Sequence, residues 1–207
     1  MRRIMPVTIV AALCLMAGAA DAFAQTYYLG VRGGYNYSHE SQVQAGGVSG
    51  LPATFDPTGA AAVAFGFEWT DGWRFEGETS WRRAAFDSIG ALPANNGDAE
   101  IYATLVNVYY GLRKDAIVNP YLGGGVGVAR LSVADLVVGA ATVDDFGVGM
   151  AWQGIVGVDF TLSQSWVLSL DYRYFAVEET KLVDSLNLPF KIDYQGGTAM
   201  LGLRVGF

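Results

Sequence analysis

The sequence is poor in the side chains that carry most enzyme chemistry. Its 207 residues include one cysteine, Cys14, and one histidine, His39. Cys14 lies in an N-terminal stretch that we expect to be removed, which leaves no thiol for catalysis, a disulfide or a metal site. One histidine is too few for a convincing metal site. We therefore expect no metal and no cofactor.

Charged residues are scarce as well. They make up 16% of the chain, whereas soluble proteins carry about 25%. The chain is 52% hydrophobic and its mean hydropathy is +0.27. This composition indicates a very large core or an exterior that does not face water. The net charge of −7 lacks the basic footprint that nucleic-acid binding requires.

Long apolar runs are absent except at the start of the chain. Arg2 and Arg3 precede an apolar stretch over 4–20 and the small-residue motif 22–24, which is typical of a signal peptide. We expect a signal peptide over 1–24 and one domain over 25–207. No other run reaches the length of about 18 residues that a spanning helix needs. An exported apolar chain of this kind is a soluble β protein or a closed membrane barrel.

Alternation of apolar and polar residues, the period of a β-strand, is what the chain does have. In the last stretch Leu201, Leu203 and Val205 share one face, and Met200 and Arg204 share the other. Segments of this kind lie at 26–37, 59–70, 73–83, 100–112, 120–131, 148–162, 166–177 and 192–207.

The connections between these eight segments are alternately long and short, as in outer-membrane barrels with short periplasmic turns and long external loops. The predicted fold is therefore all-β: an eight-stranded antiparallel up-and-down transmembrane barrel. A soluble barrel with an apolar interior is the alternative, but the balanced charges described next favour a polar interior.

Aromatic residues lie near the short-turn end of each segment and predict a girdle at one membrane interface. Phe207 closes this set. The other girdle residues are Tyr27, Trp69, Trp73, Tyr110, Tyr121, Phe160 and Trp166.

The polar faces carry five bases and five acids, and a barrel of eight strands is just wide enough to be filled by side chains. Because buried charge is tolerated only when it is paired, we predict an ion-pair network that plugs the lumen. Glycines 123, 125 and 127 would give facing side chains room. A narrow channel is the alternative. The ten residues are Arg32, Glu68, Arg74, Glu76, Glu78, Arg82, Asp159, Asp171, Arg173 and Arg204.

The stretches 107–110, 120–127 and 169–175, with sequences NVYY, PYLGGGVG and SLDYRYF, resemble small bacterial outer-membrane barrels of the opacity-like and surface-antigen type, relatives in shape of the OmpA barrel. The resemblance covers the chain after the leader, including Phe207. It implies an outer-membrane location and assembly by the barrel machinery, with the aromatic C-terminal strand that ends at Phe207 as the assembly signal. It also implies a role as an adhesin, an antigen or a general envelope protein.

Function is expected to reside in the external loops. Their apolar and acidic residues suit a host or envelope ligand, on a monomer that is not an enzyme. The acids are Asp135, Asp144, Asp145, Glu178, Glu179 and Asp184. A lipid-modifying barrel enzyme that uses His39 is the less favoured alternative, because Ser38, His39 and Glu40 are adjacent and cannot form a triad among themselves.

Overall fold

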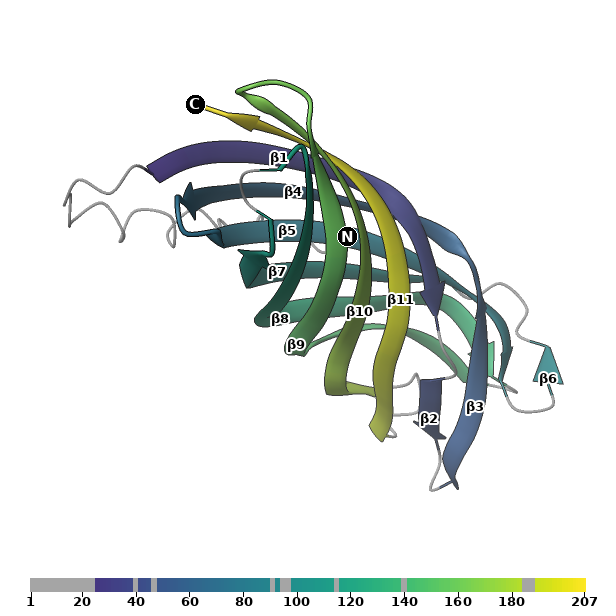
Figure 1. Ribbon diagram of the computed structural model, residues 1–207. Helices are drawn as coiled ribbons and strands as arrows, with labels where there is room; N and C mark the ends of the chain where they lie inside the picture. The colour runs from purple at the N-terminus through teal and green to yellow at the C-terminus, as the bar shows by residue number, and fades with distance from the viewer. Residues whose placement is uncertain are drawn as a thin grey trace, which may run out of the picture.

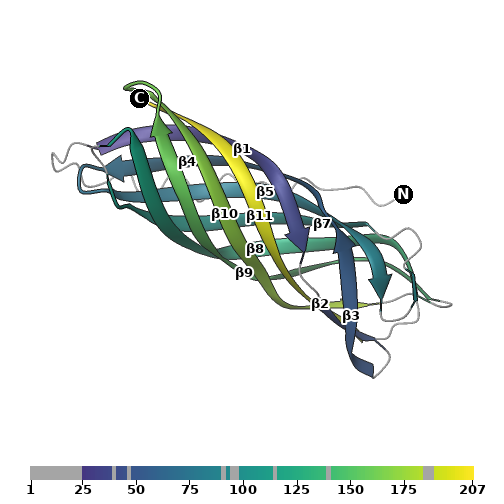
Figure 2. The ribbon, with the colours of Figure 1, turned by 45° about the vertical axis from the view of Figure 1, so that its right-hand side comes forward.

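The computed structural model describes residues 25–38, 41–45, 48–89, 92–93, 98–113, 116–138, 141–183 and 189–207. Eight long antiparallel strands curl into a barrel (Figures 1 and 2). They are β1 (Gln25–Ser38), β4 (Thr58–Trp69), β5 (Trp73–Ile89), β7 (Asp98–Gly111), β8 (Val118–Val138), β9 (Ala141–Thr161), β10 (Trp166–Val183) and β11 (Pro189–Gly206). The predicted strands are all present. No helix among the described residues is long and apolar enough to cross a membrane.

Each barrel strand pairs with its neighbours in sequence, and the first pairs with the last. The β1–β11 ladder runs from Tyr28 opposite Gly206 to Ser38 opposite Gly196. The Phe207 N–H also donates to the Tyr27 carbonyl at 2.9 Å, which extends this seam past the end of β11. The sheet is therefore closed, and the eight-stranded prediction is confirmed.

The short turns lie at the same end of the barrel as the end of β11 (Figure 1). Between β4 and β5, Gly72 has φ +95°, a left-handed conformation that glycine adopts without strain. Its N–H donates to the Trp69 carbonyl at 3.1 Å, and Asp71 Oδ1 accepts the Trp73 N–H at 3.3 Å. A tight hairpin turn over 70–72 therefore joins β4 to β5.

The segment 38–58, expected to be a loop, contains two further strands. These are β2 (Ser41–Ala45) and β3 (Val48–Asp56), which pair with each other in the register that β1 and β4 begin. β2 also pairs with β11, and β3 pairs with β5. The hairpin thus continues the barrel wall at the long-loop end. The loop prediction was wrong here because pairing with both neighbours imposes a strand.

Other strands are also longer than predicted. β8 runs to Val138 instead of 131, and β9 begins at Ala141 instead of 148. Asp135, Asp144 and Asp145, expected in loops, therefore lie on strands, as do Glu178 and Glu179 of β10. A two-residue strand, β6 (Leu92–Pro93), pairs with β5. The barrel extends well beyond the length of about 9–11 residues that a tilted strand needs to cross a bilayer.

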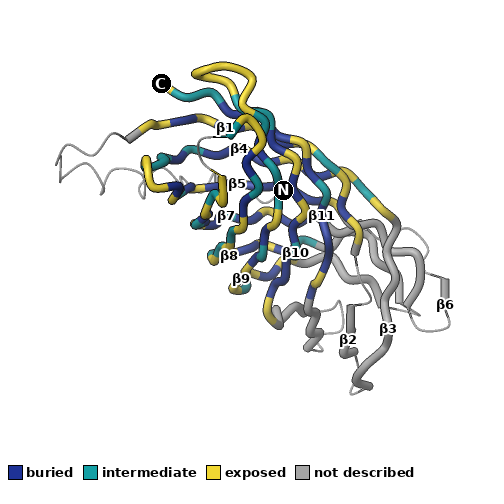
Figure 3. Tube along the Cα trace, in the orientation of Figure 1, coloured by how far each residue is buried: buried dark blue, intermediate teal, exposed yellow. Residues whose placement is uncertain are grey.

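Buried and exposed residues alternate along the strands (Figure 3). The exposed set is apolar and faces outwards, and includes Leu29, Val63, Val106, Val126, Leu170 and Leu201. The buried set contains the charged residues. This inversion relative to a soluble protein is what a lipid exterior requires.

Aromatic residues gather at the short-turn end, on the outer face. Trp73 and Tyr110 lie with ring centroids 5.0 Å apart, and Trp69 packs edge-on against Phe67 at 4.9 Å. Tyr27, Trp166 and Phe207 are exposed at this end, and Phe160 is half-buried.

Tyr121 does not belong to this outer set. Only 2% of its surface is exposed, and its hydroxyl donates to Asp171 inside the barrel at 3.0 Å. It alternates with Leu122, which is exposed, so the two residues point to opposite sides of the wall. The prediction that Tyr121 is a girdle residue was therefore wrong.

Leu201 offers a direct test of the outward register. It lies midway along β11, opposite Gly33 and Leu170, and it is exposed. We expect Leu201→Arg to lower the free energy of unfolding by about 2–4 kcal/mol, because a midplane arginine meets hydrocarbon. The measurement is guanidinium unfolding in phospholipid vesicles, followed by tryptophan fluorescence.

The control is Val148→Arg, which places the same charge at an exposed outward site near the external end. A cost of about 0–1 kcal/mol is expected there. Equal costs at the two positions would contradict the assigned depth.

Candidate functional site

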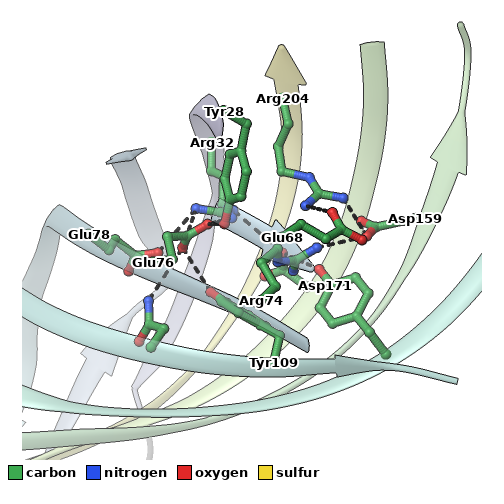
Figure 4. A network of polar contacts seen from close by, with 12 residues as sticks. Tyr28, Arg32, Glu68, Arg74, Glu76, Glu78, Tyr109, Asp159, Asp171 and Arg204 are labelled. Atoms are coloured by element: carbon green, nitrogen blue, oxygen red, sulfur yellow. Dashed lines mark hydrogen bonds and ion pairs between the residues drawn. The ribbon is translucent and has the colours of Figure 1, made fainter. Parts of the chain in front are cut away.

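The inward residues of the barrel form the most highly organised polar cluster in the described part of the chain. β5 supplies the largest share of it, because every second residue from Arg74 to Arg82 points inward and is buried. The opposing groups come from β1, β7, β9, β10 and β11. Figure 4 shows their polar contacts from close by.

Glu76 is the centre of this network. Arg32 donates two hydrogen bonds to it, of 2.7 Å and 3.0 Å. The hydroxyls of Tyr28 and Tyr109 donate to it at 2.8 Å and 2.9 Å (Figure 4). The side chain is 2% exposed or less, so these donors replace the water that a carboxylate would otherwise hold.

Small residues on β4 make the Arg32–Glu76 contact possible. β4 lies between β1 and β5, and its inward residues at these levels are Ala62, Ala64 and Gly66. Side chains of β1 and β5 therefore reach each other across β4 without obstruction.

A second contact spans the whole lumen. Arg173 Nη1 lies 2.6 Å from Glu78 Oε2, and Arg173 Nε lies 2.6 Å from Asp171 Oδ1. Arg173 is on β10 and Glu78 is on β5, which stand on opposite sides of the eight-stranded ring. A direct ion pair between opposite walls means that side chains fill the barrel at this level.

At the short-turn end Asp159 joins two arginines. It accepts hydrogen bonds from Arg74 at 2.9 Å and from Arg204 at 2.6 Å. Arg204 also lies 3.5 Å from Glu68, whose side chain is 36% exposed at the mouth. The Arg74 guanidinium lies over the Tyr109 ring at 4.2 Å.

Arg82 differs from the other predicted network residues in the contacts that the structure describes. Among the described residues no carboxylate lies within the 4.0 Å ion-pair limit of its guanidinium. It donates to Ser80 at 2.7 Å and to Gln153 at 3.4 Å, and it lies over the Phe175 ring at 4.0 Å. Within the described part of the chain, Arg82 therefore relies on neutral donors and acceptors and on an aromatic ring.

At and beyond the level of Arg82, towards the long-loop end, the described inward residues are uncharged. Ile101, Leu131, Phe175 and Val177 are exposed by 3% or less. Asn36 is buried there too, and it accepts a hydrogen bond from Thr198 at 3.0 Å and donates one to Tyr194 at 2.6 Å. The described charges of the lumen therefore gather in its short-turn half.

Several glycines stand opposite the large inward side chains. Tyr109 faces Gly123 directly across the β7–β8 ladder, and Tyr121 faces Gly157 across β8–β9. A Cβ atom built at either glycine would collide with the facing ring. Tyr28 and Gly66 repeat the arrangement across β1–β4. The glycines thus give each tyrosine the room to reach its carboxylate.

The tyrosines and amides of the lumen were not among the predicted network residues. Tyr28, Tyr109 and Tyr121 donate to its acids, and Gln153 joins Asn107 and Glu78 at 2.9 Å and 3.4 Å. All of them follow the inward alternation of their strands, so the same signal that identified the charged residues also identifies them. His39 and Asp184 lie outside the described residues.

The comparisons with known proteins agree with this geometry. The family model described as outer membrane protein beta-barrel domain matches residues 10–206. The chain belongs to the outer-membrane β-barrel family. A search of curated proteins gave no match.

Solved structures of other barrel proteins share the fold. The chain is 19% identical to the outer membrane protein OprG from Pseudomonas aeruginosa, with a TM-score of 0.63 over 88% of this chain and 97% of that one. It is 19% identical to Neisserial surface protein A, NspA, with a TM-score of 0.57 over 87% and 97%. The protein is thus an outer-membrane component of the Gram-negative envelope.

Removal of the central carboxylate tests the energetics of the lumen. We expect Glu76→Ala to lower the free energy of unfolding by about 3–5 kcal/mol, because it leaves Arg32 buried without its main partner. Glu68→Ala is the control, since Glu68 is partly exposed and its loss should cost less than about 1 kcal/mol. Unfolding in phospholipid vesicles measures both. Similar costs would contradict the central role of Glu76.

The close approach of Tyr109 to Gly123 gives a second test. We expect Gly123→Val to destabilise the barrel by about 1–3 kcal/mol through overpacking against Tyr109. Tyr109→Ala in the same chain should remove part of that cost. Gly124→Val is the matched control, because its side chain would point outward and meet its nearest neighbour at an ordinary 3.6 Å. Purely additive effects in a double-mutant cycle would argue against the contact.

Proposed function

We propose that this barrel conducts no solute and acts at the cell surface as a monomeric, non-catalytic interaction protein. The observation that carries the proposal is the Arg173–Glu78 pair, which joins opposite walls of the lumen at 2.6 Å. A barrel filled in this way offers no aqueous path at that level. Its outer face meets lipid, so the external extensions of its strands are the part free to meet partners.

The external part is also substantial. The hairpin of β2 and β3 and the extensions of β8, β9 and β10 continue the wall past the length needed to cross the bilayer. We infer that they form a surface for a host or envelope ligand, after assembly by the barrel machinery. NspA is itself named a surface protein.

Two measurements test the proposal together. In planar bilayers the refolded protein should give no single-channel steps under conditions in which a porin does. On bacteria without other adhesins, its expression should raise adherence to epithelial cells above the empty-vector level. Replacement of residues 41–56 by a short Gly-Ser turn should abolish that gain, because it removes β2 and β3.

The control for the deletion is the Glu68→Ala chain, which alters the opposite end of the barrel. Its adherence should equal that of the unaltered protein. Reproducible channel steps would replace the proposal with a narrow porin. Adherence at the empty-vector level for the unaltered protein would end the interaction role.

A further inference from the structure

One seam of the barrel opens at the external end. β9 and β10 pair from Thr161 opposite Val167 as far as Ala151 opposite Val177, and the described residues beyond these are not paired across the seam. β9 continues to Ala141 in partnership with β8 alone, and β10 continues to Val183 in partnership with β11 alone. The two hairpins run apart in Figure 1.

The place where pairing ends coincides with the edge of the membrane. Counted from the aromatic girdle, a tilted strand crosses the bilayer in about 9–11 residues. On β9 that count runs from Phe160 to about Ala151, and on β10 it runs from Trp166 to about Ala176. Inside hydrocarbon every backbone group must be paired, whereas water can satisfy it above. The unpaired edges therefore lie in the external aqueous region.

The backbone groups that face this seam can be identified. At the other end of β9, the Thr161 N–H donates to the Ile117 carbonyl on the β8 side, and the Leu162 N–H donates to the Trp166 carbonyl on the β10 side. The side to which the backbone N–H and C=O groups point alternates from one residue to the next along an antiparallel strand. The backbone groups of even-numbered β9 residues therefore point towards β10. The β8–β9 register is unbroken from Phe160 to Asp145. Phe146 and Val148 therefore present their N–H and C=O groups to the open seam.

The two segments that flank the seam are acidic. They contain Asp144, Asp145, Glu178 and Glu179 against a single base, Lys181. A strand edge with free backbone donors and acceptors is a template for another extended chain. The surrounding negative charge selects a partner that is basic.

We propose that the open edge of β9 binds an extended, basic polypeptide segment by strand addition. The partner's backbone completes the ladder beyond Ala151, and its lysines or arginines meet the acids of the two segments. This proposal rests on the proposed surface interaction and names the kind of partner that the surface takes.

The test uses the protein in nanodiscs of phosphatidylcholine, which carries no net charge. The probe is a fluorescent ten-residue peptide of alternating lysine and threonine, and its binding is followed by anisotropy. A second peptide has the same sequence and charge with every other backbone nitrogen methylated, so it cannot complete a ladder. We expect the methylated peptide to bind at least about tenfold more weakly.

Val148→Pro is the matching change in the protein. It removes an N–H that faces the seam and breaks no bond to β8, so the barrel should fold normally. Peptide binding should again weaken by about tenfold or more. Val148→Ala keeps the N–H and should bind as the unaltered protein does. The slower migration of unheated protein in electrophoresis, compared for all variants, reports folding.

Four outcomes of the binding and sedimentation experiments overturn the proposal. They are equal binding of the methylated peptide, unchanged binding by Val148→Pro, no binding of either peptide, and a dimer in sedimentation that Val148→Pro dissolves. The third would mean that the acids only protect the edge, and the fourth that the edge takes a second copy of this chain. If Val148→Pro retains full adherence to epithelial cells, the seam proposal fails while the proposed surface function stands.

Discussion

The structure depends on one constraint: no backbone N–H or C=O group can remain unpaired in hydrocarbon. A sheet satisfies this only by closing, and β1 and β11 close it along a ladder that starts at Tyr28 and continues to Ser38. The same constraint explains where closure stops. Above the bilayer water takes over as partner, and there the β9–β10 ladder ends at Ala151. The closed barrel within the bilayer and the open β9–β10 seam above it both follow from this need to satisfy backbone hydrogen bonds.

The distribution of the side chains also follows from the lipid that surrounds the barrel. Lipid outside leaves the interior as the place for charge, and eight strands leave too little width for a column of bulk water. Each inward charge therefore relies on a protein partner, as Glu76 does on Arg32, Tyr28 and Tyr109. Long side chains fit only where the facing residue is small. The glycines at positions 66, 123 and 157 and the alanines of β4 are thus a requirement of the charged lumen.

Most of the fold could be predicted from alternation alone, because a barrel wall with two different solvents enforces a period of two on every strand. The hairpin of β2 and β3 could not. Its sequence contains Gly50 and Pro52, residues that disfavour strands, and only pairing with β11 and β5 makes it extended.

The membership of the lumen network was also largely readable, but its pairing was not. Arg32 meets Glu76 across an intervening strand, and Arg173 meets Glu78 across the full barrel. Such contacts depend on the stagger of the strands and on the barrel diameter, which a linear pattern does not contain. Arg82 is an example of a contact that the sequence pattern does not determine. It shares the inward face of Glu78, yet its level in the barrel places it beside Phe175.

The pairing of β1 with β11 has a kinetic consequence. It joins the two strands of the sheet that are most distant in sequence, so its formation carries the greatest loss of chain entropy. Until this ladder forms, the chain is an open sheet with two unpaired strand edges and an apolar face. The rate of this single step sets how long the protein is vulnerable to aggregation on its way into the membrane.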